Sequence, residues 1–197
     1  MAKLLYQGHG SFRLTSADGV VLYVDPFMGT GYDVPADIIL TTHQHDDHTK
    51  ISLITQKPDC HVIQSYDALV DGVYKTFSIK GINIEAVEAG YNAGHDVNNC
   101  VGYLVVIDGL TLYFLGDTST TPHMKTMPER NLDYAFICAD GFYNMNLEEA
   151  AACAKLMGAR HNVPVHLKPG EIFDREMAER FDAPNKLIIE GGSEVEL

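Results

Sequence analysis

In the stretch Thr41-Thr42-His43-Gln44-His45-Asp46-Asp47-His48, three imidazoles and two carboxylates fall within six consecutive positions. The apolar residues 37–41 predict a buried strand, so these side chains follow where the strand opens into a loop. Residues two apart in an extended segment point the same way, which lets His43 and His45 approach one cation. Asp47 and His48, beyond a turn, can face a second cation. The stretch therefore predicts half of a two-metal site, against the alternatives of a solvated polar loop or a helix cap.

Strands are predicted in two clusters, and each cluster leads into a residue of metal-binding type. In the first, residues 11–15 and 20–24 flank a short turn, the pattern of a β-hairpin, and lead into Asp25. The second cluster repeats this pattern and leads into Asp117, with strands expected at residues 82–86, 101–107 and 110–115. Such strand ends are where layered folds place their chemistry.

The rest of the chain adds helices to these strands. Residues 147–157 predict a helix with Asn146 as N-cap and Gly158 as C-cap. The other elements predicted in this part of the chain are strands at 132–139, 162–167 and 186–190 and a helix at 174–181. Strands in two groups, with helices between and after them, predict two sheets packed face to face and covered outside by helices.

Three further residues complete a possible ligand set. His95 lies in a loop before a predicted strand, Asp117 follows a strand and a glycine, and His166 ends a short strand. Each alone is weak evidence, because a single histidine is more often structural and an aspartate after glycine often only forms a turn. Together with the first stretch they supply the six or seven ligands that two cations need, with one carboxylate between them.

Composition narrows the class of protein. The 197 residues, 46% of them hydrophobic, fit one compact domain spanning residues 1–197. The net charge of −13 argues against long nucleic acids as partners. No window is apolar enough to cross a bilayer, and the start of the chain lacks a signal peptide, so we expect no membrane partner and a cytoplasmic location. The four scattered cysteines are expected to be reduced.

The chain resembles the metallo-β-lactamase fold superfamily, whose HxHxDH signature stands here at residues 43–48. The resemblance implies a four-layer αβ/βα sandwich, in which two mixed β-sheets pack together with helices on the outer faces. It also implies a division of the ligands: His43, His45 and His95 for one metal, Asp47, His48 and His166 for the other, and Asp117 bridging both. The opening residues 8–12 and the segment 147–166 look closer to the branch of the L-ascorbate-6-phosphate lactonase.

The same residues indicate a chemistry. Two divalent cations, zinc first with manganese or iron as alternatives, lower the pKa of bound water and so stabilise a bridging hydroxide near neutral pH. This predicts a binuclear hydrolase of a small anionic substrate such as a lactone, a phosphodiester or a related ester. Asp47 is the candidate catalytic proton acceptor.

Four residues are second-tier candidates around this centre. Asp25, at the end of a strand, is expected to orient a ligand imidazole, or else only to form a turn. His9, between glycines, is a candidate for substrate contact or a structural residue. Lys168 is a candidate partner for a substrate phosphate, and Thr118 a candidate support for Asp117. The aromatic segment 140–145 is expected either to line a pocket or to pack in the core.

Two other functions remain open at this point. A di-iron oxidoreductase uses nearly the same ligands, but its first motif would be expected to contain a glutamate, and no flavin domain follows here. A metal-binding protein without turnover is the third hypothesis, although loss of catalysis usually leaves gaps in such a ligand set.

Overall fold

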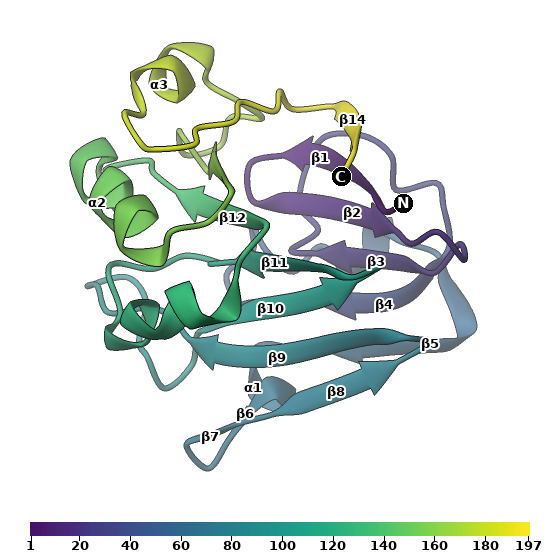
Figure 1. Cartoon of the computed structure of the whole chain (residues 1–197). Coiled ribbons are helices and arrows are strands. Elements are labelled where there is room, and N and C mark those ends of the chain that lie inside the picture. Colours follow the sequence, from purple (N-terminus) through teal and green to yellow (C-terminus); the bar gives the residue numbers. More distant parts are fainter.

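Two six-stranded sheets form the body of the protein in a computed structural model that describes residues 1–197 (Figure 1). The first sheet has the order β14-β1-β2-β3-β4-β5. Its strands are β1 (Lys3–Gly8), β2 (Ser11–Thr15), β3 (Val21–Val24), β4 (Ala36–Leu40), β5 (Gln56–Ile63) and β14 (Ser193–Glu196). The predicted β2–β3 hairpin is confirmed, with Phe12 paired to Val24 in antiparallel register.

The second sheet has the order β13-β12-β11-β10-β9-β8. Its strands are β8 (Thr76–Ile79), β9 (Ile82–Glu88), β10 (Val101–Ile107), β11 (Leu110–Phe114), β12 (Tyr134–Cys138) and β13 (His161–Val165). A separate small hairpin, β6 (Leu69–Val70) with β7 (Val73–Tyr74), projects beside them. Both large sheets are therefore mixed, and the predicted fold of two packed β-sheets with helices outside is confirmed.

Alternating side chains of the two sheets meet in one apolar core between them. Leu22, Val24, Ile38 and Leu40 of the first sheet are buried in the same cluster as side chains from β9 to β13. Phe12 joins the sheets directly, because its ring centroid lies 5.0 Å from that of Phe114 and 4.8 Å from that of Phe136. Burial of this apolar area is the main force that holds the two sheets together.

Helices cover the outer face of the second sheet. Its cover consists of η2 (Pro122–Arg130), α2 (Leu147–Met157) and α3 (Arg175–Arg180). The predicted boundaries of α2 are confirmed, since the Asn146 side chain accepts from the Glu149 N–H and Gly158 adopts the left-handed conformation. The outer face of the first sheet instead packs beneath Tyr32, Val34 and η1 (Ile51–Leu53), which surround a smaller cluster. The remaining helix is the short α1 (Ser65–Ala68).

The strand predicted at residues 186–190 is wrong. Lys186 makes only an isolated bridge to Asn162 of β13, and the last strand is β14, which pairs with β1. Asn162 makes the first hydrogen bonds of a pairing with this segment, because its N–H donates to the Asn185 carbonyl and its carbonyl accepts from the Leu187 N–H. Pro164, two residues further along β13, faces the same neighbouring segment but has no N–H to donate, so the pairing does not continue.

The parallel strands bring the chemistry to one edge. β3 and β4 are parallel neighbours in the first sheet, and β11, β12 and β13 are parallel neighbours in the second. The residues just after these strands are Asp25, Thr42 with His43, Asp117, Asp140 and His166. Open sheets hold their sites beyond the carboxyl ends of parallel strands.

None of the helices is both long and apolar enough to cross a membrane.

Candidate metal centre

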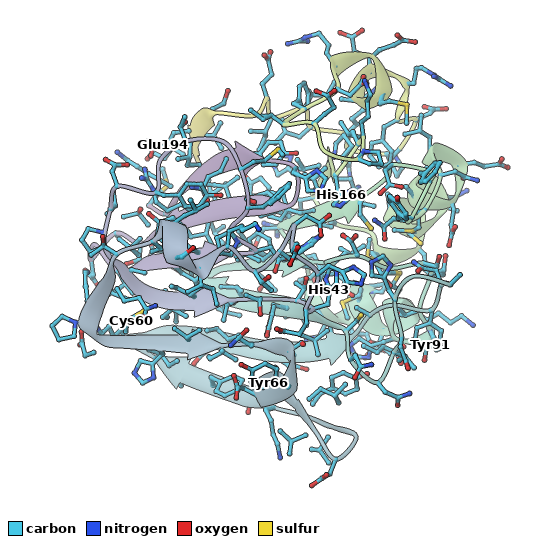
Figure 2. The ribbon with its side chains drawn as sticks, turned by 180° about the vertical axis from the view of Figure 1, so that it is seen from behind. His43, Cys60, Tyr66, Tyr91, His166 and Glu194 are labelled. Atoms are coloured by element: carbon cyan, nitrogen blue, oxygen red, sulfur yellow. The ribbon has the colours of Figure 1, made fainter.

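The structure brings all seven predicted ligands together at this edge. His43 and His166 both lie inside the molecule, whereas Cys60 of β5 lies at the far end of the first sheet (Figure 2). The ligands come from separate parts of the chain, since residues 43–48 follow β4, His95 lies between β9 and β10, and Asp117 and His166 follow β11 and β13. The fold thus assembles them from both sheets.

One group of side chains is formed by His43, His45 and His95, whose nitrogens lie within 4.8 Å of one another. His43 Nε2 is 3.1 Å from His45 Nδ1. His95 Nε2 is 3.3 Å from Asp117 Oδ2. Burial, with the charge of His48, holds the pKa of His43 well below its usual range. His43 is therefore neutral, the form of imidazole that binds a metal.

A second group lies on the other side of Asp117. His48 Nε2 is 3.3 Å from Asp117 Oδ1, and His166 Nε2 is 3.4 Å from Asp117 Oδ2. The Asp47 carboxylate is 3.9 Å from each of these two imidazole nitrogens. Asp117 thus contacts both groups, as a bridging ligand would.

These separations fit zinc-like coordination. Two nitrogen or oxygen ligands at about 2.05 Å from a tetrahedral ion are themselves about 3.3 Å apart. Moreover, Nε2 of His48 and Nε2 of His166 are buried and face the carboxylates of Asp117 and Asp47 at 3.3–3.9 Å. A cation between these nitrogens and carboxylates supplies a partner to each of them. The donor set therefore fits two divalent ions.

Asp117 is ionised although it is almost completely buried. Burial by itself raises the pKa of its carboxyl group, but the charges of His166 and His48 and the hydrogen bonds from His48 and His95 outweigh this effect. The pKa of Asp117 therefore lies well below its usual range. A carboxylate held in this form between two imidazole groups is suited to binding cations on both sides.

Four of the imidazoles are oriented through Nδ1 by a nearby oxygen. In the first group, His43 Nδ1 is 3.1 Å from Thr42 Oγ1 and His95 Nδ1 is 2.8 Å from Asn92 Oδ1. In the second, His48 Nδ1 is 2.9 Å from Asp25 Oδ2 and His166 Nδ1 is 2.9 Å from Asp140 Oδ2. Such contacts fix the tautomer and leave Nε2 free for a metal. The first pair has neutral partners and the second pair has carboxylates.

Asp25 has the orienting position predicted for it rather than only a turn. Besides contacting His48, it accepts from the Thr42 N–H and from Thr42 Oγ1, each at 2.7 Å. Its φ of +47° and the +48° of His166 lie in the left-handed region, which is strained for these residues. Strain of this kind persists where the surrounding structure fixes a functional geometry.

The contacts do not support the role predicted for Thr118, and the role predicted for Lys168 stays a prediction. Thr118 Oγ1 donates to the carbonyl of Gly90 at 3.0 Å and accepts its N–H at 2.9 Å, so it ties two loops together instead of supporting Asp117. The side chain of Lys168 is exposed, with Nζ 3.6 Å from Glu171. His9, in contrast, is buried against Asp47 and His166.

Three residues that contact the ligands were not predicted from the sequence: Asn92, Asp140 and Asn144. Asn144 Nδ2 donates to Asp117 Oδ2 at 2.9 Å and to Asp140 Oδ2 at 2.8 Å. Burial raises the pKa of Asp140, but hydrogen bonds from His166 and the Phe142 N–H outweigh it and lower that pKa to about 2. The aromatic side chains of the same segment, Phe142 and Tyr143, are exposed and not in the core. The available signal was that Asp140 follows a strand as Asp25 and Asp117 do.

Comparison with known proteins agrees with this geometry. A family model described as the beta-lactamase superfamily domain matches residues 3–166. A protein of Thermococcus kodakarensis named as a metal-dependent hydrolase is 28% identical, with 100% of each chain covered. The crystal structure of a protein from Parabacteroides distasonis described as a metal-dependent hydrolase has a TM-score of 0.77 at 28% identity, covering 95% of this chain and 92% of that one. The lactonase branch stays a prediction. The chain belongs to the beta-lactamase superfamily.

Proposed function

We propose that this protein is a binuclear metal-dependent hydrolase of small anionic substrates, with zinc, manganese or iron as its cations. The observation that carries the proposal is the placement of Asp117: its Oδ2 lies 3.3 Å from His95 Nε2 of the first group and 3.4 Å from His166 Nε2 of the second, and its Oδ1 lies 3.3 Å from His48 Nε2. The relatives named as metal-dependent hydrolases support the same reaction class.

When bound, two divalent cations would supply Lewis acidity, which lowers the pKa of bound water and polarises the bond under attack. The protein supplies position and charge. Asp117 fixes the spacing of the two groups, while Asp25 and Asp140 hold His48 and His166 in the tautomer with a free Nε2. Water is admitted from the side of Asp47, which is 37% exposed, in contrast to the buried Asp117.

Asp47 is the proton acceptor in this proposal. Burial raises the pKa of its carboxyl group, but the contact with His9 and the charge of His48 outweigh that effect and hold the pKa below its usual range. Asp47 is therefore ionised at neutral pH. Its partial exposure lets it take a proton from the attacking water and release it to solvent.

The charge of the centre favours an anion. Only two of the seven ligand side chains, Asp47 and Asp117, are carboxylates, so the four positive charges of two divalent cations exceed the charge of the ligands themselves. The surface of the protein is strongly acidic, with a net charge of −13. We therefore propose a small substrate and not a nucleic acid, because a long polyanion would be repelled by the surface before reaching the centre.

A cavity of about 510 Å³ beside His43 and His45 is the proposed place for the rest of the substrate. Its lining contains amides and hydroxyls, one carboxylate, and no lysine or arginine: Gln44, Ser65, Tyr66, Asp96, Asn98 and Asn99 are its polar members beside the two histidines. A second anionic group would find no cationic partner there. The substrate charge is therefore expected at the cations, with an uncharged polar portion in the cavity.

Hydrolysis of lactones, phosphodiesters and carboxylic esters by the metal-free and the reconstituted protein tests the proposal. We expect turnover only after reconstitution, and a much lower kcat for Asp47→Asn even at metal concentrations that fill both positions. Within the active class, a substrate with an uncharged distal group should have a higher kcat/KM than its anionic analogue, and Asn99→Lys should reduce that preference. Equal hydrolysis with and without metal would refute the hydrolase mechanism.

A further inference from the structure

His9 is a buried imidazole that the two ligand groups leave unused. It lies in the turn between β1 and β2, and only 1% of it is exposed. Its ring centroid is 3.7 Å from that of His166, and its Nε2 is 3.4 Å from Asp47 Oδ2. Ligand atoms of His9, Asp47, His48 and His166 all lie within 4.8 Å of one another.

The two nitrogens of His9 have different partners. Nδ1 lies 3.3 Å from the carbonyl oxygen of Glu171. A carbonyl oxygen can only accept, so Nδ1 carries a proton. In the neutral imidazole Nε2 is then an unprotonated nitrogen, and it faces a carboxylate oxygen that is also an acceptor. Two acceptors at 3.4 Å need a cation between or beside them, which is either a proton or a metal ion.

A metal ion agrees with what the other buried imidazoles do. His43, His48, His95 and His166 each have Nδ1 next to an oxygen and Nε2 directed to the centre. His9 has the same arrangement, and its Nε2 lies 3.4 Å from Asp47 Oδ2, a separation at which one cation can contact both atoms. The remaining histidines, His61, His123 and His161, are not buried and belong to no such group.

The backbone of the turn is constrained to place His9 there. Its φ is +56°, in the left-handed region, and its carbonyl accepts from Tyr6 Oη at 2.7 Å and from the His166 N–H at 2.9 Å. A Cβ at Gly8 would lie 2.5 Å from Ile172, and one at Gly10 would lie 3.2 Å from His48 Cε1. Glycines on both sides therefore let the turn approach the centre closely, at a cost in strain that the contacts of His9 offset.

We infer that His9 is a further ligand of the cation bound by Asp47, His48 and His166. The inference rests on the binuclear centre of the proposed function and extends it. With Asp117, this cation then has five protein ligands, whereas the one at His43, His45 and His95 has four, and His45 is exposed beside the cavity. The position that includes His9 is therefore the more saturated one, and the other keeps room for exchange and for substrate.

The direct test uses the wild-type protein loaded with ¹¹³Cd and labelled with ¹⁵N in its histidines. We expect ¹¹³Cd–¹⁵N coupling to Nε2 of His9, as well as to His48 and His166. His9→Asn, whose side chain tolerates the left-handed backbone but is too short to reach the cation, identifies the His9 signal. Coupling to His48 and His166 without coupling to His9 would overturn this inference alone, whereas a wild-type protein that binds no metal would overturn the proposed function as well.

Metal titration of the metal-free variants gives a second readout. His9→Asn and His9→Ala should weaken one of the two binding events by at least the 10- to 100-fold typical of losing an outer partner of a ligand, and leave the other unchanged. His61→Ala, at an exposed histidine away from the centre, is the matched control and should bind both metals as the wild type does. If folded His9 variants bind both metals with unchanged affinity, His9 is not a ligand and its contact with Asp47 is only an ion pair.

Discussion

Replacing Asp25 by asparagine is expected to weaken one of the two metals selectively. The carboxylate accepts from the Thr42 N–H at Oδ1, and at Oδ2 it accepts from Thr42 Oγ1 and contacts His48 Nδ1. Asparagine has the same shape but only one acceptor oxygen. If this oxygen stays with the Thr42 N–H, the amide N–H group faces His48 Nδ1–H, and two donors meet.

The buried imidazole can relieve that conflict only by moving its proton. His48 would then carry it on Nε2, the nitrogen 3.3 Å from Asp117 that is needed for the cation. Loss of such an orienting partner typically costs 10- to 100-fold in metal affinity, or about 1.4–2.7 kcal/mol. The first group should be affected less, because Asp25 reaches His43 only through Thr42 Oγ1 and has no part in orienting His95, which contacts Asn92.

Competition with a chromophoric chelator measures the two affinities separately in metal-free protein. Asp25→Asn should lower the affinity of the cation at His48 most, because Asp25 contacts His48 directly and His43 only through Thr42. Asn92→Leu, which removes the oxygen 2.8 Å from His95 Nδ1, is the reciprocal variant and should lower only the other affinity. Urea denaturation confirms that both variants fold. If Asp25→Asn binds both metals within twofold of the wild type, the orienting role of Asp25 is refuted.

Three further predictions concern the ligands, a buried carboxylate and a crowded glycine. Asp117→Ala should lower occupancy at both metals and His166→Ala mainly at one, as measured by metal content; equal losses would contradict the proposed division. Burial raises the pKa of Asp37, but hydrogen bonds from Lys57, Lys80 and the Val21 N–H outweigh it and lower the pKa from 3.8 to about 2. The ionised carboxylate therefore adds about 2 kcal/mol to the free energy of unfolding above pH 4, and this contribution is lost as the pH falls through 2. Urea denaturation should show Asp37→Asn less stable than the wild type by this amount at pH 7 but not at pH 2. Gly29→Ala should lower the melting temperature far more than Gly81→Ala, because both have positive φ but only at Gly29 would a Cβ lie 1.8 Å from a backbone oxygen; equal shifts would refute the steric argument.

Local signals explain which elements the sequence predicts well. The bounds of α2 follow from the caps Asn146 and Gly158, and the β2–β3 hairpin follows from its turn and alternating side chains. β5, by contrast, has only one buried residue and contains Pro58, so it carries no clear periodicity. The strand expected at 186–190 depended on a neighbour, β13, whose Pro164 stops the pairing.

The candidate site likewise has a part that the sequence predicts, the ligands, and a part that it does not, their hydrogen-bond partners. Its seven ligands are predictable because chemistry concentrates them at strand ends and in one dense stretch. The partners of those ligands depend on which elements the fold places together, as Asn144 shows by reaching Asp117 from 27 positions away. Thr118 illustrates the reverse case, because its neighbour Asp117 is adjacent in sequence while its hydroxyl contacts Gly90.

The central claim is that this chain holds two cations bridged by Asp117. The most direct measurement is the metal content, in moles per chain, of protein purified without chelator or histidine tag, before and after reconstitution. The account predicts about two ions of zinc, manganese or iron per chain, falling at both positions in Asp117→Ala. A protein that binds no metal even after reconstitution would contradict it.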